Sequence, residues 1–161
     1  MPRRREVPER PCPPDPIYGS PLATKFINAI MRDGKRGVAV AIFYSAMEKI
    51  QEKTQDDPLK VFKRAVENVK PVMEVKSRRV GGSNYQVPVE VAPKRRLSLA
   101  MRWLLGYAAD RPERTMVDKL AGELMDASAG RGGAIKKKEG LRALPLVSRT
   151  ALHSVNEARR P

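Results

Sequence analysis

Lysine and arginine are the side chains whose type and spacing could do chemistry in this sequence, and that chemistry is phosphate binding. The chain has 161 residues, with 32 Lys and Arg against 18 Asp and Glu and a formal net charge of +14. Such an excess favours a polyanionic partner, and nucleic acid is the first candidate. The cations gather in these candidate binding clusters: Arg3, Arg4 and Arg5; Lys35 and Arg36; Lys76, Arg78 and Arg79; Lys94, Arg95 and Arg96; Arg131, Lys136, Lys137 and Lys138.

Side chains suited to catalysis or metal binding are scarce. The chain has one histidine, His153, and one cysteine, Cys12, which is too little for a His-based triad or a multi-histidine metal site. No carboxylate pair at a recognisable metal-binding spacing accompanies the basic clusters. We therefore expect no catalytic residue, no metal, no cofactor and no enzymatic activity. Since the apolar runs are far shorter than the ~20 residues that span a bilayer, we expect a cytoplasmic protein with no membrane partner.

Helical periodicity covers most of the chain. Apolar stripes predict helices from Pro21, from about residue 35 to 53, from Pro58 to before Pro71, from Pro93, and over residues 113–130. Proline at a first helical position and glycine after the last one are typical of helix boundaries. The predicted fold class is mainly α, a single-domain helical bundle of about five to six helices with one protruding two-stranded antiparallel β-hairpin.

The hairpin is predicted over about residues 73–91, where EVKSRRVGGSNYQVPVEV reads as two strands around a glycine turn. If the odd-numbered apolar residues of both strands, such as Val75 and Val87, share a face, odd positions must pair with odd positions. That register requires a loop of three or five residues and excludes a two-residue turn. A ribbon with a cationic tip is typical of β-arms that meet phosphates in nucleic-acid grooves.

The ends of the chain differ from its centre. Residues 1–19 combine an arginine cluster with six prolines. Such a segment buries little apolar surface, so we expect an extended basic N-terminal arm. The helical domain, including the hairpin, is expected over residues 20–139, and residues 140–161 form a tail.

Four stretches resemble the bacterial small-subunit ribosomal protein seven family, in the same order and at the same spacing. They are KFINAIMRDGKR, VFKRAVENVKPVMEVKSRRVGGSNYQVPVEV, RRLSLAMRWL and AIKKKE. The resemblance covers residues 1 to about 139. It implies a six-helix bundle with a β-ribbon. It also implies a structural constituent of the small ribosomal subunit, a primary binder of the 3′ major domain of 16S rRNA that nucleates assembly of the head.

The resemblance also implies the contacts of particular residues. The rRNA contacts are implied to fall on the first four basic clusters given above. The ribbon tip is implied to lie at the subunit interface beside exit-site tRNA and the mRNA path; it comprises Arg79, Val80, Gly81, Gly82, Ser83, Asn84 and Tyr85. Further implied partners are ribosomal proteins nine and eleven and the mRNA of the protein's own operon.

The tail departs from this family. Its members continue after Lys-Lys-Glu with a helix and end near Ala-Phe-Ala-His-Tyr-Arg-Trp, whereas residues 140–161 read GLRALPLVSRTALHSVNEARRP. Codon degeneracy allows residues 140–147 and the first nucleotide of Ser148 to be written as GGC CTT CGC GCA CTA CCG CTG GTA A. Read one nucleotide later, these codons would encode Ala-Phe-Ala-His-Tyr-Arg-Trp and a stop. We hypothesise a deletion with a frameshift after Glu139; the alternative is a divergent tail, and the sequence of the locus decides between them.

A second reading of the basic surface is a general DNA- or RNA-binding regulator that uses the ribbon or a helix. No helix-turn-helix signature favours it. The two readings predict different nucleic-acid preferences: a regulator would bind duplex DNA more tightly, whereas a ribosomal protein would bind structured rRNA more tightly.

Overall fold

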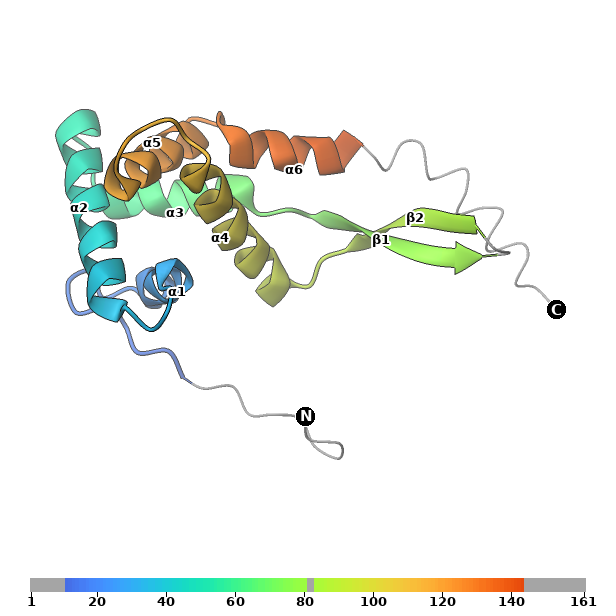
Figure 1. The fold of residues 1–161 in the computed structure, drawn as a ribbon, viewed down its shortest axis with the longest axis horizontal. Coiled ribbons are helices and arrows are strands. Elements are labelled where there is room, and N and C mark those ends of the chain that lie inside the picture. Colours follow the sequence, from blue (N-terminus) through green and yellow to red (C-terminus); the bar gives the residue numbers. More distant parts are fainter. Residues whose placement is uncertain (1–10, 81–82, 144–161) are drawn as a thin grey trace.

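Six helices and one β-hairpin form the part of the chain that this computed structural model describes, residues 11–80 and 83–143 (Figure 1). The elements follow one another as α1 (Pro21–Ile30), α2 (Arg36–Thr54), α3 (Pro58–Val69), β1 (Met73–Val80), β2 (Ser83–Glu90), α4 (Pro93–Ala109), α5 (Met116–Ser128) and α6 (Gly133–Ala143). The mainly α fold with one antiparallel hairpin is therefore confirmed. Among the helices described, none has the length and apolarity needed to cross a bilayer.

The helices begin where the sequence supplies suitable boundary residues. Pro21, Pro58 and Pro93 stand at the first positions of α1, α3 and α4, where a missing N–H removes no intrahelical hydrogen bond. The side chains of Asp57 and Thr115 accept backbone hydrogen bonds at the starts of α3 and α5. Each cap satisfies an N–H that would otherwise lack a partner within its helix.

Three phenylalanines form the centre of the core. Phe26 of α1, Phe43 of α2 and Phe62 of α3 are each fully buried, with ring centroids between 5.1 and 5.9 Å apart. Tilted and edge-to-face aromatic pairs of this kind are favourable beyond the area they bury. The first three predicted stripes therefore meet in one core, which packs further against α4 and α5.

A buried carboxylate holds the start of α6 against the bundle. Glu123 of α5 is 1% exposed; it accepts hydrogen bonds from Arg111 Nη1 at 3.0 Å and from the backbone N–H of Ala134 at 3.1 Å. Gly132, at φ +98°, makes the turn before α6, and a Cβ there would lie 3.0 Å from Glu123 Oε1. Glycine thus allows the chain to pass close to the carboxylate.

The hairpin register differs from the prediction. Val80 pairs with Ser83 and Lys76 pairs with Val87, so odd positions pair with even ones. Two residues, 81–82, connect the strands, and the predicted loop of three or five residues is wrong. Val87 consequently lies across from a lysine instead of a valine. A ribbon that stands away from the bundle has no core face to bury along its length, so its apolar pattern does not determine its register.

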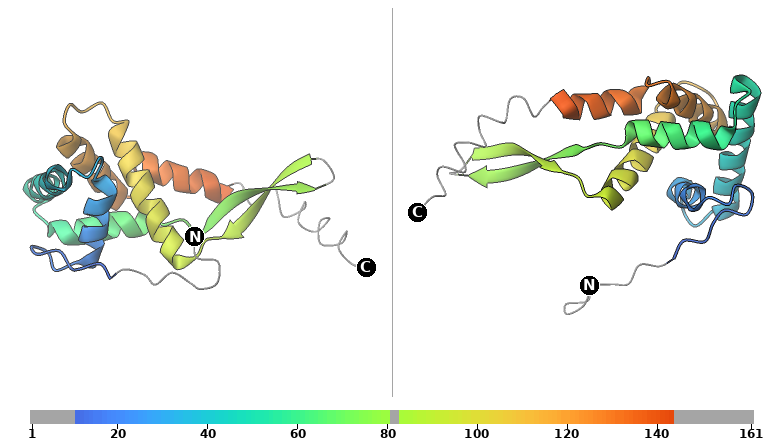
Figure 2. Two further views of the ribbon diagram at one scale, coloured as in Figure 1. Left: turned by 60° about the horizontal axis from the view of Figure 1, so that its bottom comes forward. Right: turned by 180° about the vertical axis from the view of Figure 1, so that it is seen from behind.

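The ribbon projects from one end of the bundle (Figures 1 and 2). Its base lies between the start of α4 and α6, and α6 packs beside β1. Val91, just after β2, is 1% exposed and its N–H donates to the main-chain oxygen of Val72 at 3.1 Å. The base is thus part of the folded domain, while the strands beyond it extend into solvent.

Candidate nucleic-acid interface

A basic groove of about 800 Å³ runs between α1 and α4. Its charged lining residues are Lys25, Arg32, Lys94 and Arg102, all exposed, and no acidic residue lines it. Neutral side chains, including Asn28 and Ser98, complete the walls. Positive charges gathered along one groove attract anions such as phosphate groups.

Three of these cations were not predicted as site residues from the sequence. Lys25 lies on α1 and Arg32 in the loop that follows it, whereas Lys94 and Arg102 lie eight residues apart on α4, a spacing that places these two near one face of the helix. For Arg102 the helical spacing from Lys94 is a signal that the sequence offers; Lys25 and Arg32 have no such signal. The predicted clusters are contiguous in the sequence, whereas the groove is built from isolated cations on α1, on the loop after it and on α4.

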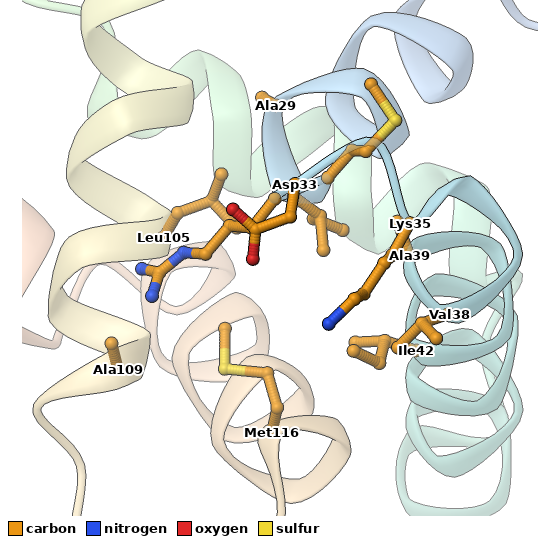
Figure 3. A pocket seen from close by; sticks show the side chains of 12 residues that line it. Ala29, Asp33, Lys35, Val38, Ala39, Ile42, Leu105, Ala109 and Met116 are labelled. Atoms are coloured by element: carbon orange, nitrogen blue, oxygen red, sulfur yellow. The ribbon is translucent and has the colours of Figure 1, made fainter.

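A smaller cavity of about 420 Å³ opens beside the groove (Figure 3). Its apolar wall comprises Ile30, Met31, Val38, Ile42, Leu105 and Met116. Asp33 and Lys35 also line it, and Figure 3 shows both reaching over the space between Leu105 and Ile42. The side chain of Val38 is unusually open for an aliphatic residue, since 58% of its surface is exposed. An apolar cavity with a few charged groups at its rim is typical of a ligand site.

Groove and cavity adjoin each other. Ala29, Arg32 and Leu105 line both. A ligand that follows the groove would therefore pass beside the cavity. The predicted residues Lys35 and Lys94 are brought to this one surface, although they are 59 positions apart in the sequence.

Other predicted cations lie on the ribbon or outside the described residues. Lys76 and Arg79 are exposed on β1, and Asn84 is exposed opposite Arg79. Arg36 is exposed at the start of α2. Five predicted residues lie outside the described part of the chain: Arg3, Arg4, Arg5, Gly81 and Gly82. Four more lie on the strands, but their side chains are outside it: Arg78, Val80, Ser83 and Tyr85.

The predicted cluster on α6 is divided between surface and interior. Arg131, Lys136 and Lys137 are exposed, whereas Lys138 is half-buried. Lys138 Nζ donates a hydrogen bond to the main-chain oxygen of Asn68. The three exposed cations are accessible to phosphate groups, whereas the ammonium group of Lys138 already has a partner within the protein.

Two arginines of the predicted cluster at the start of α4 also have partners within the protein. Arg95 Nε lies 2.7 Å from Glu74 Oε2, and Arg96 Nη2 lies 2.7 Å from Glu90 Oε1. The hydrogen bond from Arg95 lowers the pKa of Glu74 below its ordinary value. Both glutamates belong to the ribbon, so the start of α4 and the ribbon are linked electrostatically.

The N-terminal segment is anchored to α2 by a buried aspartate. Asp15 is 4% exposed and accepts hydrogen bonds from Tyr44 Oη at 2.7 Å and from the backbone N–H of Tyr18 at 3.0 Å. Burial and the hydrogen bond to Asp15 raise the pKa of Tyr44 to about 12. The anchor fixes the place from which the predicted basic arm leaves the domain.

The described residues contain no group of three or more histidine, cysteine, aspartate or glutamate side chains arranged to hold a metal ion. The side chains that line the groove and the cavity are mainly cationic and apolar.

Comparison with known proteins assigns the chain to a family. A family model described as "Ribosomal protein S7p/S5e" matches residues 2–144. The chain belongs to the ribosomal protein S7 family. It is 58% identical over 153 residues to the small ribosomal subunit protein uS7 of Thermus thermophilus, covering 95% of this chain and 98% of that protein. The uS7 protein of Maridesulfovibrio salexigens is 56% identical with the same coverage, and that of Desulfovibrio desulfuricans is 57% identical over 139 residues.

Membership in the S7 family confirms several expectations. Proteins of this family are structural and non-enzymatic, so the chain is a ribosomal protein and not an enzyme. Its expected place on the ribosome, in the cytoplasm, follows from the same membership. The family match ends at residue 144 and α6 ends at Ala143, a few residues past the boundary predicted at Glu139. The frameshift hypothesis concerns a tail that lies mostly outside the described residues, and it stays a hypothesis.

Proposed function

We propose that this protein is a structural constituent of the small ribosomal subunit that binds 16S-type rRNA through the groove between α1 and α4. The observation that carries the proposal is the lining of that groove, which brings together Lys25, Arg32, Lys94 and Arg102 from α1, the loop after it and α4. Membership in the S7 family supports the ribosomal role. The alternative reading as a general DNA-binding regulator has no comparable support.

Phosphate neutralisation is the main source of affinity in this proposal. The groove cations and the exposed ribbon residues Lys76 and Arg79 provide six contacts. Neutralising about six phosphates makes binding steeply salt-dependent, with roughly a thousandfold loss of affinity between about 50 and 200 mM salt. Such contacts position the protein on folded RNA and read little sequence.

The cavity beside the groove is suited to one unstacked base. RNA-binding proteins commonly accept bases that leave the helical stack, and they pack them against apolar or aromatic side chains. Here the walls are aliphatic and methionine side chains, including Leu105 and Met116, while Asp33 and Lys35 can accept from and donate to a base edge. The groove would then hold the backbone and the cavity would fix its register.

The finer roles are also proposals and rest on the resemblance described above. The protein binds the 3′ major domain of 16S rRNA and nucleates assembly of the head. Its ribbon tip, including Arg79 and Asn84, lies near the mRNA path and exit-site tRNA, and its neighbours are ribosomal proteins nine and eleven. The same surface binds the mRNA of its own operon. The exposed cations of a ribbon that projects from the domain support the placement of the tip at an RNA surface.

Competition between RNA and DNA tests this function. The full chain is bound to a labelled fragment of the 16S 3′ major domain, and unlabelled duplex DNA or the same rRNA fragment is added at about 150 mM salt. We expect the rRNA fragment to compete at far lower concentration than duplex DNA. Equal competition by the two would contradict the proposal and favour the regulator.

A further inference from the structure

The first turn of α4 contacts the base of the ribbon at two points. Arg95 Nε donates to Glu74 Oε2 at 2.7 Å. Arg96 Nη2 donates to Glu90 Oε1 at 2.7 Å, and its Nε donates to the main-chain oxygen of Val91 at 2.8 Å. The Glu74 side chain is only 13% exposed, so the first of these pairs is partly shielded from solvent and salt.

These two glutamates project from opposite faces of the ribbon. Glu90 is paired with Met73, and Glu74 is the next residue along β1. Directly paired residues share a face, and successive residues alternate between faces. One arginine therefore holds each face, and a tilt of the ribbon toward either side separates one of the two ion pairs.

Helix electrostatics alone would not place these arginines here. The first turn of α4 contains Lys94, Arg95 and Arg96 and no acidic residue. The N-terminal end of a helix carries a partial positive charge and disfavours cations. Glu74 and Glu90 are the only acidic residues in the sequence from 73 to 90, and each pairs with this turn. The ion pairs with these two glutamates thus offset the unfavourable position of the arginines at the start of the helix.

We propose that Arg95 and Arg96 are positioning residues that set the direction in which the ribbon leaves the bundle. Through that direction they determine where Lys76 and Arg79 meet RNA. The RNA consequence rests on the proposed function, whereas the direction of the ribbon is a property of the free protein. Besides Arg95, the cation that faces Glu74 is Lys76, whose Nζ is 3.3 Å away; it lies on the same strand and cannot link the ribbon to the bundle.

The test measures the distance between ribbon and bundle in the free, full-length protein. Cys12→Ser removes the only cysteine, and Gln86→Cys and Lys60→Cys introduce spin-label sites at exposed positions of β2 and α3. In this background Arg95→Glu places two carboxylates together at the ribbon base. We expect a broader or shifted distance distribution. Because an acid in the first turn favours the helix, fraying of α4 would not explain that change.

A charge swap provides the rescue. Adding Glu74→Arg to Arg95→Glu restores an ion pair of reversed polarity, and we expect the distribution to return toward the wild-type width. Arg95→Gln combined with Arg96→Gln should broaden it without introducing repulsion. A wild-type distribution in both Arg95→Glu and the double glutamine variant would overturn the proposal, as would a swap that fails to restore the width.

Arg102→Gln is the matched control for the same helix. Arg102 is exposed in the basic groove, so its replacement should weaken rRNA binding and leave the ribbon distance unchanged. A changed distance in this variant would contradict the assignment of the direction to Arg95 and Arg96. If Arg102→Gln leaves rRNA affinity intact while Arg95→Glu moves the ribbon, the proposed groove function fails and the positioning role stands.

Discussion

Lys138 of α6 donates a hydrogen bond from Nζ to the main-chain oxygen of Asn68 in the last turn of α3. Asn68 in turn donates from Nδ2 to the main-chain oxygens of Ala127 and Ser128, at 2.9 and 3.1 Å, where α5 ends. The last carbonyls of a helix have no partner within it. These two side chains therefore complete two helix ends and join three helices, and they hold α6 beside the ribbon.

Removing the Asn68 side chain should destabilise the fold. Asn68→Ala takes away the donor to two carbonyls at the half-buried end of α5. We expect the free energy of unfolding to fall by about 1–2 kcal/mol, measured by urea denaturation. Lys136→Ala, at an exposed position of α6, is the control and should change it by less than about 0.5 kcal/mol. Equal losses in the two variants would show that the α5 cap has no special role.

Tyr44 should remain protonated at a pH where ordinary tyrosines ionise. Its pKa is raised to about 12 from 10.0, so the folded state holds this proton more tightly than the unfolded state. The resulting stabilisation is present below pH 10 and is lost as the pH rises through about 12. We expect wild type and Tyr44→Phe to show nearly the same increase in tyrosinate absorbance between about pH 9 and 11. A smaller increase in Tyr44→Phe, by the amplitude of one tyrosine, would disprove the raised pKa.

A negative charge at the rim of the cavity should weaken RNA binding. Val38 is 58% exposed, so Val38→Glu can be accommodated without disturbing the core. The new carboxylate would add a negative charge beside the bound polyanion, and we expect a loss of at least about 1 kcal/mol in binding free energy to the 3′-domain fragment. Gln51→Glu makes the same charge change at an exposed site farther along α2. Comparable losses in both variants would mean that the cavity does not lie at the RNA interface.

The helical part of this fold could be predicted from the sequence because its signals are local. Pro21, Pro58 and Pro93 stand at helix starts, and the apolar stripes between them face a single core. The hairpin register could not be predicted in the same way, since Val75 and Val87 lie on a ribbon without a buried face along its length. Patterning there does not distinguish one register from the next.

The candidate site was predictable only in part. Dense clusters led to Lys35 and Lys94, which do line the groove and its cavity. Lys25 and Arg102 belong to helices far apart in the sequence, so their proximity is a property of the packing. A dense cluster of cations in the sequence also does not show that each cation is available to bind RNA, because Lys138 has a partner within the protein. Local sequence cannot show which cations face solvent and which complete helix ends.

The affinity of charge-matched variants for the 16S 3′-domain fragment tests the central claim most directly. The groove variant carries Lys25→Gln, Arg32→Gln and Arg102→Gln. The control carries Lys53→Gln, Lys60→Gln and Lys63→Gln, at exposed positions of α2 and α3 that do not line the groove. We predict that the groove variant binds weakly, with a salt-dependence slope reduced by about two to three, since each lost phosphate contact removes about 0.7–0.9. The control should keep the wild-type slope. Equal slopes and affinities in the two variants would contradict an RNA-binding role for the groove.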